Sequence, residues 1–186
     1  MGFSILKHRL VGDGVIRVDC VKNTQVIAGP DMIILHYTAG ASVLSSARYL
    51  ARPDVGASAH LVIGRAGEVV QLVPFNIVAW HAGRSWYAGR EELNHYSIGI
   101  ELDNLGQLRM EGGKFVAECG REVPFKEVYT DDSGRELTYW HKYTRVQMDV
   151  LREVCRLLKK RYPIKYVVGH SDVTARKVDP GPALQF

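Results

Sequence analysis

The chain contains three short apolar runs, and each is followed by a polar residue that could take part in chemistry. Residues 33–35 are followed by His36, residues 98–100 by Glu101 and residues 167–169 by His170. A run without polar positions is typical of a strand buried on both faces, which requires a sheet covered by helices. Because open α/β sheets place their sites at strand ends, we expect the three polar residues to meet in one crevice.

Two segments have the spacing of amphipathic helices. Residues 43–52 form the first, which Pro53 stops. Residues 144–162 form the second, which Pro163 stops and which Thr144 and Gln147 open as a capping box. The apolar face of this second helix comprises Val146, Val150, Val154, Leu157 and Leu158.

Two hairpins are expected between these elements. The first pairs residues 60–63 with residues 68–73 through a turn at Gly64 and Gly67. The second lies in a more polar stretch, where residues 131–134 read Asp-Asp-Ser-Gly between two aromatic-bearing runs. We interpret this stretch, about residues 105–143, as an inserted excursion from the core.

The composition favours one globular domain spanning residues 1–186. Hydrophobic residues make up 46% of the chain and charged residues 24%, which disfavours disorder and coiled coil. No apolar stretch approaches the roughly 20 residues needed to cross a bilayer, so we expect no membrane partner. Charged residues interrupt the N-terminal apolar positions, so we expect a cytoplasmic protein; the alternatives are a released or exported lytic enzyme and a trimmed mature chain.

The net charge of +4 does not by itself identify a partner. Much of the positive charge lies in the 144–162 segment, at Arg152, Arg156, Lys159, Lys160 and Arg161. We interpret it as a solvated helix face, so we expect no nucleic-acid partner, and we expect a monomer. The three cysteines, Cys20, Cys119 and Cys155, are far apart and form no C-x-x-C, which indicates reduced thiols.

The two strand-end histidines are candidate metal ligands. A catalytic zinc site needs about three protein ligands and one open position, and His36 and His170 supply two. The third is Asp172 or Asp179, and we favour Asp179 because Pro180 holds it extended. The extended period of two then places Lys177 beside Asp179, where its ammonium could stabilise an oxyanion. The plainer alternatives are buried structural histidines, an ion pair at Glu101 and a solvated Lys177.

Five ordered motifs favour the metal site over these alternatives. They are LHYTAG around His36, SAHLVIGRAGEVVQLVP around His60, AWHAG around His81, NHYSIGIELDN around Glu101 and GHSDVTARKVDPGPAL from His170 to Asp179. Together they resemble the zinc-dependent N-acetylmuramoyl-L-alanine amidases, the superfamily of cytosolic muropeptide-recycling amidases, amidase-type phage lysozymes and peptidoglycan recognition proteins. The resemblance covers about residues 30–104 and 144–184.

The resemblance implies a fold, a cofactor and a reaction. The fold is α/β, with a central mixed, largely parallel β-sheet flanked by α-helices. The cofactor is Zn²⁺, held by His36, His170 and Asp179. Glu101 would act as general base and then general acid, and Lys177 would hold the oxyanion. The substrate would be peptidoglycan or a muropeptide, cut between the lactyl group of N-acetylmuramic acid and L-alanine.

Other motif residues have two interpretations each. His81 contacts substrate or supports the site, Trp80 binds substrate or packs, and Asn94 contacts the peptide or makes a turn. His60 is expected to be structural and not a fourth ligand. Three aromatic residues of the excursion form either a lip over the site or cross-strand packing, which we favour: Tyr129, Tyr139 and Trp140.

The sequence also departs from its relatives. Ala59 stands where the phage and recognition-protein branches have a tyrosine, so Glu101 must serve instead, as in the recycling branch. Gly56 and Glu92 stand where the recycling branch has arginines, which leaves both anhydro-muropeptides and intact wall open as substrates. A non-catalytic muropeptide recognition module and a zinc peptidase cutting within the stem peptide are the alternative functions.

Overall fold

The computed structural model describes residues 2–27, 29–134 and 136–186. Its elements are β1 (Ser4–Leu6), β2 (Arg9–Val11), β3 (Val15–Arg17), β4 (Met32–Tyr37), α1 (Val43–Ala51), β5 (Leu61–Ile63), β6 (Val69–Gln71), β7 (Trp86–Tyr87), β8 (Arg90–Glu91), the 3-10 turn η1 (Leu93–His95), β9 (Ser97–Leu102), β10 (Gln107–Glu111), β11 (Lys114–Ala117), β12 (Glu122–Val123), η2 (Phe125–Glu127), β13 (Val128–Asp131), β14 (Thr138–His141), α2 (Arg145–Arg161), β15 (Tyr166–Gly169) and α3 (His170–Val173).

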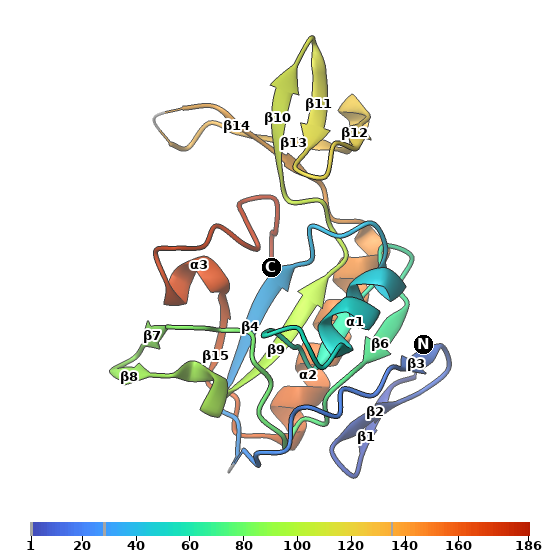
Figure 1. The fold of residues 1–186 in the computed structure, drawn as a ribbon, viewed down its shortest axis with the longest axis vertical. Helices are drawn as coiled ribbons and strands as arrows, with labels where there is room; N and C mark the ends of the chain where they lie inside the picture. Colours follow the sequence, from blue (N-terminus) through green and yellow to red (C-terminus); the bar gives the residue numbers. More distant parts are fainter. Residues whose placement is uncertain (1, 28, 135) are drawn as a thin grey trace.

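A six-stranded sheet with the order β15-β4-β9-β5-β6-β3 forms the centre (Figure 1). Every neighbouring pair is parallel except β5 and β6, which form the expected antiparallel hairpin. The predicted mixed, largely parallel sheet is therefore confirmed.

Helices cover both faces of this sheet (Figure 1). Because side chains alternate along a strand, Ile33 and Leu35 of β4 pack with α2, whereas Ile34 packs on the opposite face with Val173 of α3. Val43 of α1 packs with strands β5 and β6 on that second face. The strands are thus buried on both faces, as their continuous apolar runs predict.

The two long helices begin close to the predicted residues, with two differences in α2. Thr144 accepts a hydrogen bond from the Gln147 backbone, but the Gln147 side chain does not return to Thr144, so the predicted capping box is only half formed. The Gln147 amide instead donates to the carbonyls of Ile63 (2.9 Å) and Asp103 (3.1 Å), which lie at the ends of β5 and β9. Val146, expected on the apolar face, is 45% exposed because Gln147 and Met148 form the buried side of this first turn.

The excursion forms a second, antiparallel sheet with the order β12-β11-β10-β14-β13, beyond the carboxyl ends of β4 and β9 (Figure 1). The hairpin expected around residues 131–134 is β13 and β14, in which Tyr129 lies opposite Trp140. Tyr139 packs against Phe115, with ring centroids 4.9 Å apart. Trp140 is buried, so it forms packing and not an exposed lip. That residues 1–186 fold as one domain stays a prediction.

Two further expectations concern the surface and the thiols. The basic residues of α2 all lie on its exposed side, as expected for a solvated face. Cys20, Cys119 and Cys155 are free thiols, which confirms that prediction. None of the helices in the described parts of the chain has the length and apolar character to span a membrane.

Replacing Gln147 should weaken the attachment of α2 to the sheet. We expect Gln147→Leu to lower the free energy of unfolding by about 1 kcal/mol, because the Asp103 carbonyl loses its donor, whereas the Ile63 carbonyl keeps the Asp103 backbone amide. Urea unfolding followed by circular dichroism measures the change, with the exposed Arg145→Ala in the same helix as control. An unchanged midpoint in Gln147→Leu would show that the amide contributes nothing to this attachment.

Candidate metal centre and its groove

Strand register brings the first two candidate residues together. β4 and β9 pair in parallel with His36 opposite Glu101, both on the sheet face turned away from α2. Both strands run two residues beyond their apolar runs, so both side chains lie within the strands and not at their tips. His170 is the first residue of α3, directly after β15, which is the neighbour of β4 on its other side.

His36, His170 and Asp179 converge on one point. His36 Nδ1 lies 3.1 Å from His170 Nδ1, and Asp179 Oδ2 lies 3.0 Å from each of these nitrogens. All three side chains are buried. Tetrahedral zinc with bonds of about 2.0–2.1 Å separates its ligand atoms by about 3.3 Å, so the three atoms are spaced as ligands of one ion. They form the one such group found in the described chain.

A chain of hydrogen bonds assigns the tautomer of His36. Ser97 Oγ donates to the Leu93 carbonyl at 2.7 Å, so this oxygen is left to accept from His81 Nε2 at 3.3 Å. Burial lowers the pKa of both His81 and His36, so both rings are neutral. His81 Nδ1 must then accept a hydrogen bond from His36 Nε2, 3.1 Å away. The Nδ1 of His36 is therefore a lone pair that faces the cluster.

The loop that carries His81 and Ala82 also orients His170. The carbonyl of Ala82, which can only accept, lies 3.4 Å from His170 Nε2, so this nitrogen is the donor and Nδ1 is turned toward the cluster. Asn94 holds the loop in place, because its side-chain oxygen accepts from the backbone amides of His81 (3.0 Å) and Ala82 (2.8 Å). Two inward-facing imidazole nitrogens and a carboxylate thus meet at one point, which is the environment of a bound cation.

The segment that carries Asp179 is held by contacts on both sides of this residue. The Asp179 carbonyl accepts from the Ser171 amide at 2.8 Å, and the Pro180 carbonyl accepts from the Tyr143 hydroxyl at 2.8 Å. Gly181 lies so close to the indole of Trp140 that a Cβ there would come within 2.5 Å of the ring. Asp172 instead accepts from the Gly169 amide, at the start of α3, so it caps that turn.

Glu101 and Lys177 line the same cavity as the three candidate ligands, a space of about 410 Å³. The Oε2 atom of Glu101 is buried and has no hydrogen-bond partner in the described structure. Burial raises the pKa of Glu101 to about 8, Asp179 adds to the rise, and Lys177 opposes it. A cation bound nearby would favour the carboxylate form. Lys177 is exposed and lies two residues before Asp179, and both residues line this cavity.

The remaining predicted residues either line the cavity or hold the backbone around it. Trp80 is 40% exposed and lines the cavity, so it is placed to touch a ligand, while the buried His81 both lines the cavity and supports His36. The side-chain oxygen of Asn94 accepts from the backbone amides of the loop. A contact between Asn94 and a peptide stays a prediction. His60 uses both ring nitrogens for backbone groups, accepting from Gly99 (3.0 Å) and contacting the Ile77 carbonyl (2.9 Å), so it has no nitrogen left for a metal.

Sequence reasoning missed Ser97 and Gly99. Both share the period of two with Glu101 along β9, and this spacing is the signal that could have found them. Ser97 is the last acceptor in the chain of hydrogen bonds that sets the tautomers of His81 and His36. Gly99 leaves room for the ring of His81, since a Cβ at position 99 would lie 2.4 Å from that ring. Ala59 is fully buried, so the position of the helper tyrosine in other branches holds packing here.

Known proteins share this pattern and this fold. The family described as N-acetylmuramoyl-L-alanine amidase matches residues 26–182. The chain is 38% identical over 132 residues to the 1,6-anhydro-N-acetylmuramyl-L-alanine amidase AmpD of Escherichia coli (strain K12), an alignment that covers 69% of this chain and 54% of that protein. The chain thus spans about half the length of the curated relatives it matches.

Two solved structures extend the likeness to the whole fold. The crystal structure of a Se-Met AmpD derivative matches with a TM-score of 0.64 and 28% identity, covering 94% of this chain and 92% of that one. The amidase AmiD from E. coli, in complex with anhydro-N-acetylmuramic acid-L-Ala-D-gamma-Glu-L-Lys, matches with a TM-score of 0.65 and 27% identity. That match covers 99% of this chain and 63% of AmiD.

Removing the Ser97 hydroxyl should weaken metal binding without touching a ligand. Second-sphere changes of this kind typically lower metal affinity about 10- to 100-fold, and we expect Ser97→Ala to fall in this range because His81 loses the acceptor that sets its tautomer. Competition with a zinc-binding dye measures the affinity, with the exposed Ser4→Ala as the matched loss of a hydroxyl. Equal affinities in the two variants would contradict the tautomer assignment.

His60 should make stability depend on pH. Burial lowers the pKa of His60 to about 4, against an ordinary value near 6.5, so the unfolded chain binds the proton first as the pH falls. Stability contributed by neutral His60 is complete above about pH 6.5 and is lost toward pH 4, by roughly 3 kcal/mol. Urea unfolding measures the free energy of unfolding of the metal-free wild type and of His60→Gln. The difference between the two free energies should narrow as the pH falls over this range. A difference that stays constant would contradict the lowered pKa of His60.

Proposed function

Because the chain belongs to the N-acetylmuramoyl-L-alanine amidase family, we propose that it is a zinc-dependent amidase. The bond cut joins the lactyl group of N-acetylmuramic acid to the L-alanine of the stem peptide, in peptidoglycan or in muropeptides. The observation that carries the proposal is the buried triangle of His36, His170 and Asp179, with an unpartnered carboxylate oxygen of Glu101 in the same cavity. Two neutral imidazoles, one carboxylate and an open side are the ligand pattern of catalytic zinc.

The reaction divides between the ion and the protein. When bound, zinc supplies Lewis-acid activation of water and of the scissile carbonyl. Glu101 accepts the proton of the attacking water at Oε2 and returns it to the departing amine of alanine, a role typically worth about 10²- to 10⁴-fold in rate. Lys177, at the same cavity, holds the negative charge that develops on the carbonyl oxygen. His81 and Ala82 keep both imidazoles turned so that Nδ1 faces the ion.

We propose a muropeptide of the kind bound by AmiD as the substrate class. Its stem begins with L-alanine, continues with a γ-linked D-glutamate whose α-carboxylate is free, and then carries L-lysine with a side-chain amine. We also propose that the chain acts as a monomeric single domain in the cytoplasm; these three points rest on the sequence pattern alone.

The catalytic role of Glu101 can be separated from metal binding. We expect Glu101→Gln to retain a full zinc complement and to lose about 10²- to 10⁴-fold in turnover, because the amide cannot take a proton from water. Mass spectrometry of a muropeptide digest, with and without a chelator, identifies the bond that is broken, and zinc content is measured on the same samples. The exposed Glu111→Gln on β10 is the matched control.

Three results would contradict the proposal. Unchanged muropeptide with the zinc-loaded wild type would indicate a recognition module instead of an enzyme. Cleavage within the stem peptide would indicate a peptidase. Near-normal turnover of Glu101→Gln would remove Glu101 from the mechanism.

A further inference from the structure

One wall of the candidate metal-centre cavity is built from irregular chain. Ala57, Ser58 and Trp80 form this wall, and Ala57 and Trp80 also line an adjoining cavity of about 320 Å³. Ala57 and Ser58 belong to the loop of residues 52–58, which follows α1 and is neither helix nor strand. Because this loop has no hydrogen-bond ladder of its own, its backbone carbonyls need donors from elsewhere in the chain.

A single ammonium group supplies these donors. Lys22 Nζ lies 2.8 Å from the carbonyl oxygen of Arg52, 2.6 Å from that of Val55 and 2.8 Å from that of Ala57. An ammonium group carries three protons, so each proton has one acceptor. Within residues 2–27, 29–134 and 136–186, the carbonyls of Val55 and Ala57 have no other donor. Arg52 also caps the carboxyl end of α1, where a positive charge is favourable.

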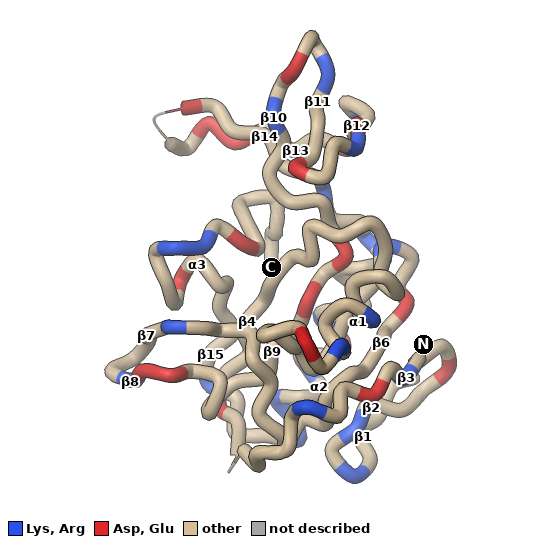
Figure 2. The backbone as a smooth tube through the Cα atoms, in the orientation of Figure 1, with Lys and Arg blue, Asp and Glu red and all other residues tan. Residues whose placement is uncertain are grey.

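The segment that carries Lys22 is itself anchored near Trp80. Lys22 is the one basic residue between β3 and β4, and Figure 2 shows this segment running below the loop that follows α1. The Asn23 side chain donates to the Val78 carbonyl at 2.9 Å, and the Gln25 carbonyl accepts from the Val78 amide at 2.7 Å. The backbone of Lys22 is therefore fixed to the strand-like chain that leads to Trp80.

The loop and Trp80 are joined by two reciprocal hydrogen bonds. The Ser58 amide donates to the Trp80 carbonyl at 2.9 Å, and the Trp80 amide donates to Ser58 Oγ at 2.8 Å. Lys22 Nζ also lies 5.8 Å from the centre of the Trp80 ring, within the range of a cation–π interaction. One ammonium group thus contacts both the loop and the indole that form the wall.

We propose that Lys22 is a positioning residue for this wall. Its ammonium binds three carbonyls of the loop, and the loop, through Ser58, sets the position of Trp80 at the cavity. Lys22 lies before residues 26–182, the part of the chain that matches the amidase family, so the family pattern does not include this support. Its effect on the reaction rests on the proposed function. Because other segments hold the candidate metal ligands and Glu101, Lys22 acts on substrate binding and not on the chemical step.

Amide hydrogen exchange of the metal-free full chain, followed by NMR, tests the support without requiring catalysis. We expect Lys22→Met to raise the exchange rates of the Ser58 and Trp80 amides about tenfold, because their reciprocal bonds open more often when the loop is released. Lys160→Met, the loss of an exposed ammonium on α2, is the matched control and should keep the wild-type rates.

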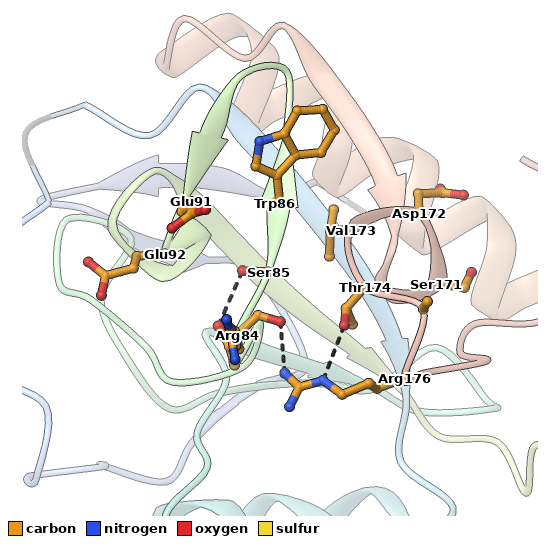
Figure 3. A pocket seen from close by; sticks show the side chains of 12 residues that line it. Arg84, Ser85, Trp86, Glu91, Glu92, Ser171, Asp172, Val173, Thr174 and Arg176 are labelled. Carbon is orange, nitrogen blue, oxygen red and sulfur yellow. Dashed lines mark hydrogen bonds between the residues drawn. The ribbon is translucent and has the colours of Figure 1, made fainter.

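A hydrogen bond of the same type elsewhere separates a local effect from general destabilisation. The Leu93 amide donates to Ser85 Oγ at 3.2 Å. Ser85 lines an outer cavity of about 1040 Å³, drawn in Figure 3, whose lining residues include none from the loop of residues 52–58. The exchange rate of the Leu93 amide should therefore stay unchanged in Lys22→Met. Equal acceleration of the Leu93, Ser58 and Trp80 amides would overturn the inference, as would wild-type rates at all three.

The variant Lys22→Arg separates the three converging bonds from the positive charge. A guanidinium keeps the charge but presents its donors in a planar fork, which cannot direct one proton at each of three converging carbonyls. We expect Lys22→Arg to leave the Ser58 and Trp80 amides exchanging faster than in the wild type. Full wild-type protection in Lys22→Arg would show that the charge alone is sufficient and would overturn the assignment.

Kinetics on muropeptides test the consequence for the reaction. We expect Lys22→Met to raise KM about tenfold and to leave kcat within about twofold of the wild type, because the wall contacts the ligand while the reacting groups keep their positions. Zinc affinity, measured by dye competition, should not change. A lower kcat at unchanged KM would place Lys22 in the chemical step and contradict its role in the wall.

The outcome can be separated from that of the proposed amidase function. A chain that leaves muropeptides uncut, but in which Lys22→Met accelerates exchange at Ser58 and Trp80, contradicts the function and leaves the positioning role standing. A chain that cuts muropeptides, but in which Lys22→Met keeps the wild-type exchange rates, contradicts the positioning role alone.

Discussion

The candidate site depends on one electrostatic constraint: two imidazole nitrogens and one carboxylate oxygen are held about 3 Å apart in a buried place. Such an arrangement is unfavourable in a protein interior unless a cation occupies the centre. The surroundings enforce it. Ser97 and the Ala82 carbonyl accept the hydrogen bonds that keep the Nδ1 atoms of His36 and His170 turned inward, one through His81 and one directly.

The sheet provides the rigidity that this constraint requires. His36 and Glu101 occupy paired positions on adjacent parallel strands, so the distance between their backbones is set by the hydrogen-bond ladder and not by a loop. Along β9 the site face holds Ser97, Gly99 and Glu101 in turn. These three positions supply a hydrogen-bond acceptor, space for a ring and the candidate catalytic carboxylate from one strand. The opposite face of the same strand packs on α2, whose Gln147 ties the helix to the strand ends.

The second sheet contributes to the site without supplying a candidate ligand. Trp140 covers Gly181, and Tyr143, just after β14, binds the Pro180 carbonyl, so the excursion holds the turn that follows Asp179. On the other side of the centre, the loop that carries His81 and Ala82 both supports the imidazoles and lines the adjoining cavity of about 320 Å³. A ligand in that cavity would therefore touch the same loop that orients the candidate metal ligands.

The sequence by itself determined the three central strands, the two long helices, the two expected hairpins and the identity of the metal-ligand candidates, because continuous apolar runs, caps and proline stops act over a few residues. The preference for Asp179 over Asp172 also came from local chemistry, the restriction that Pro180 places on the residue before it. The structure adds that Asp172 accepts from the Gly169 amide at the start of its own helix. Only the tertiary structure decided the roles of Ser97, Asn94 and the Gln147 side chain. Their partners lie in segments that a local pattern cannot bring together, so buried hydrogen-bond requirements between distant elements select them.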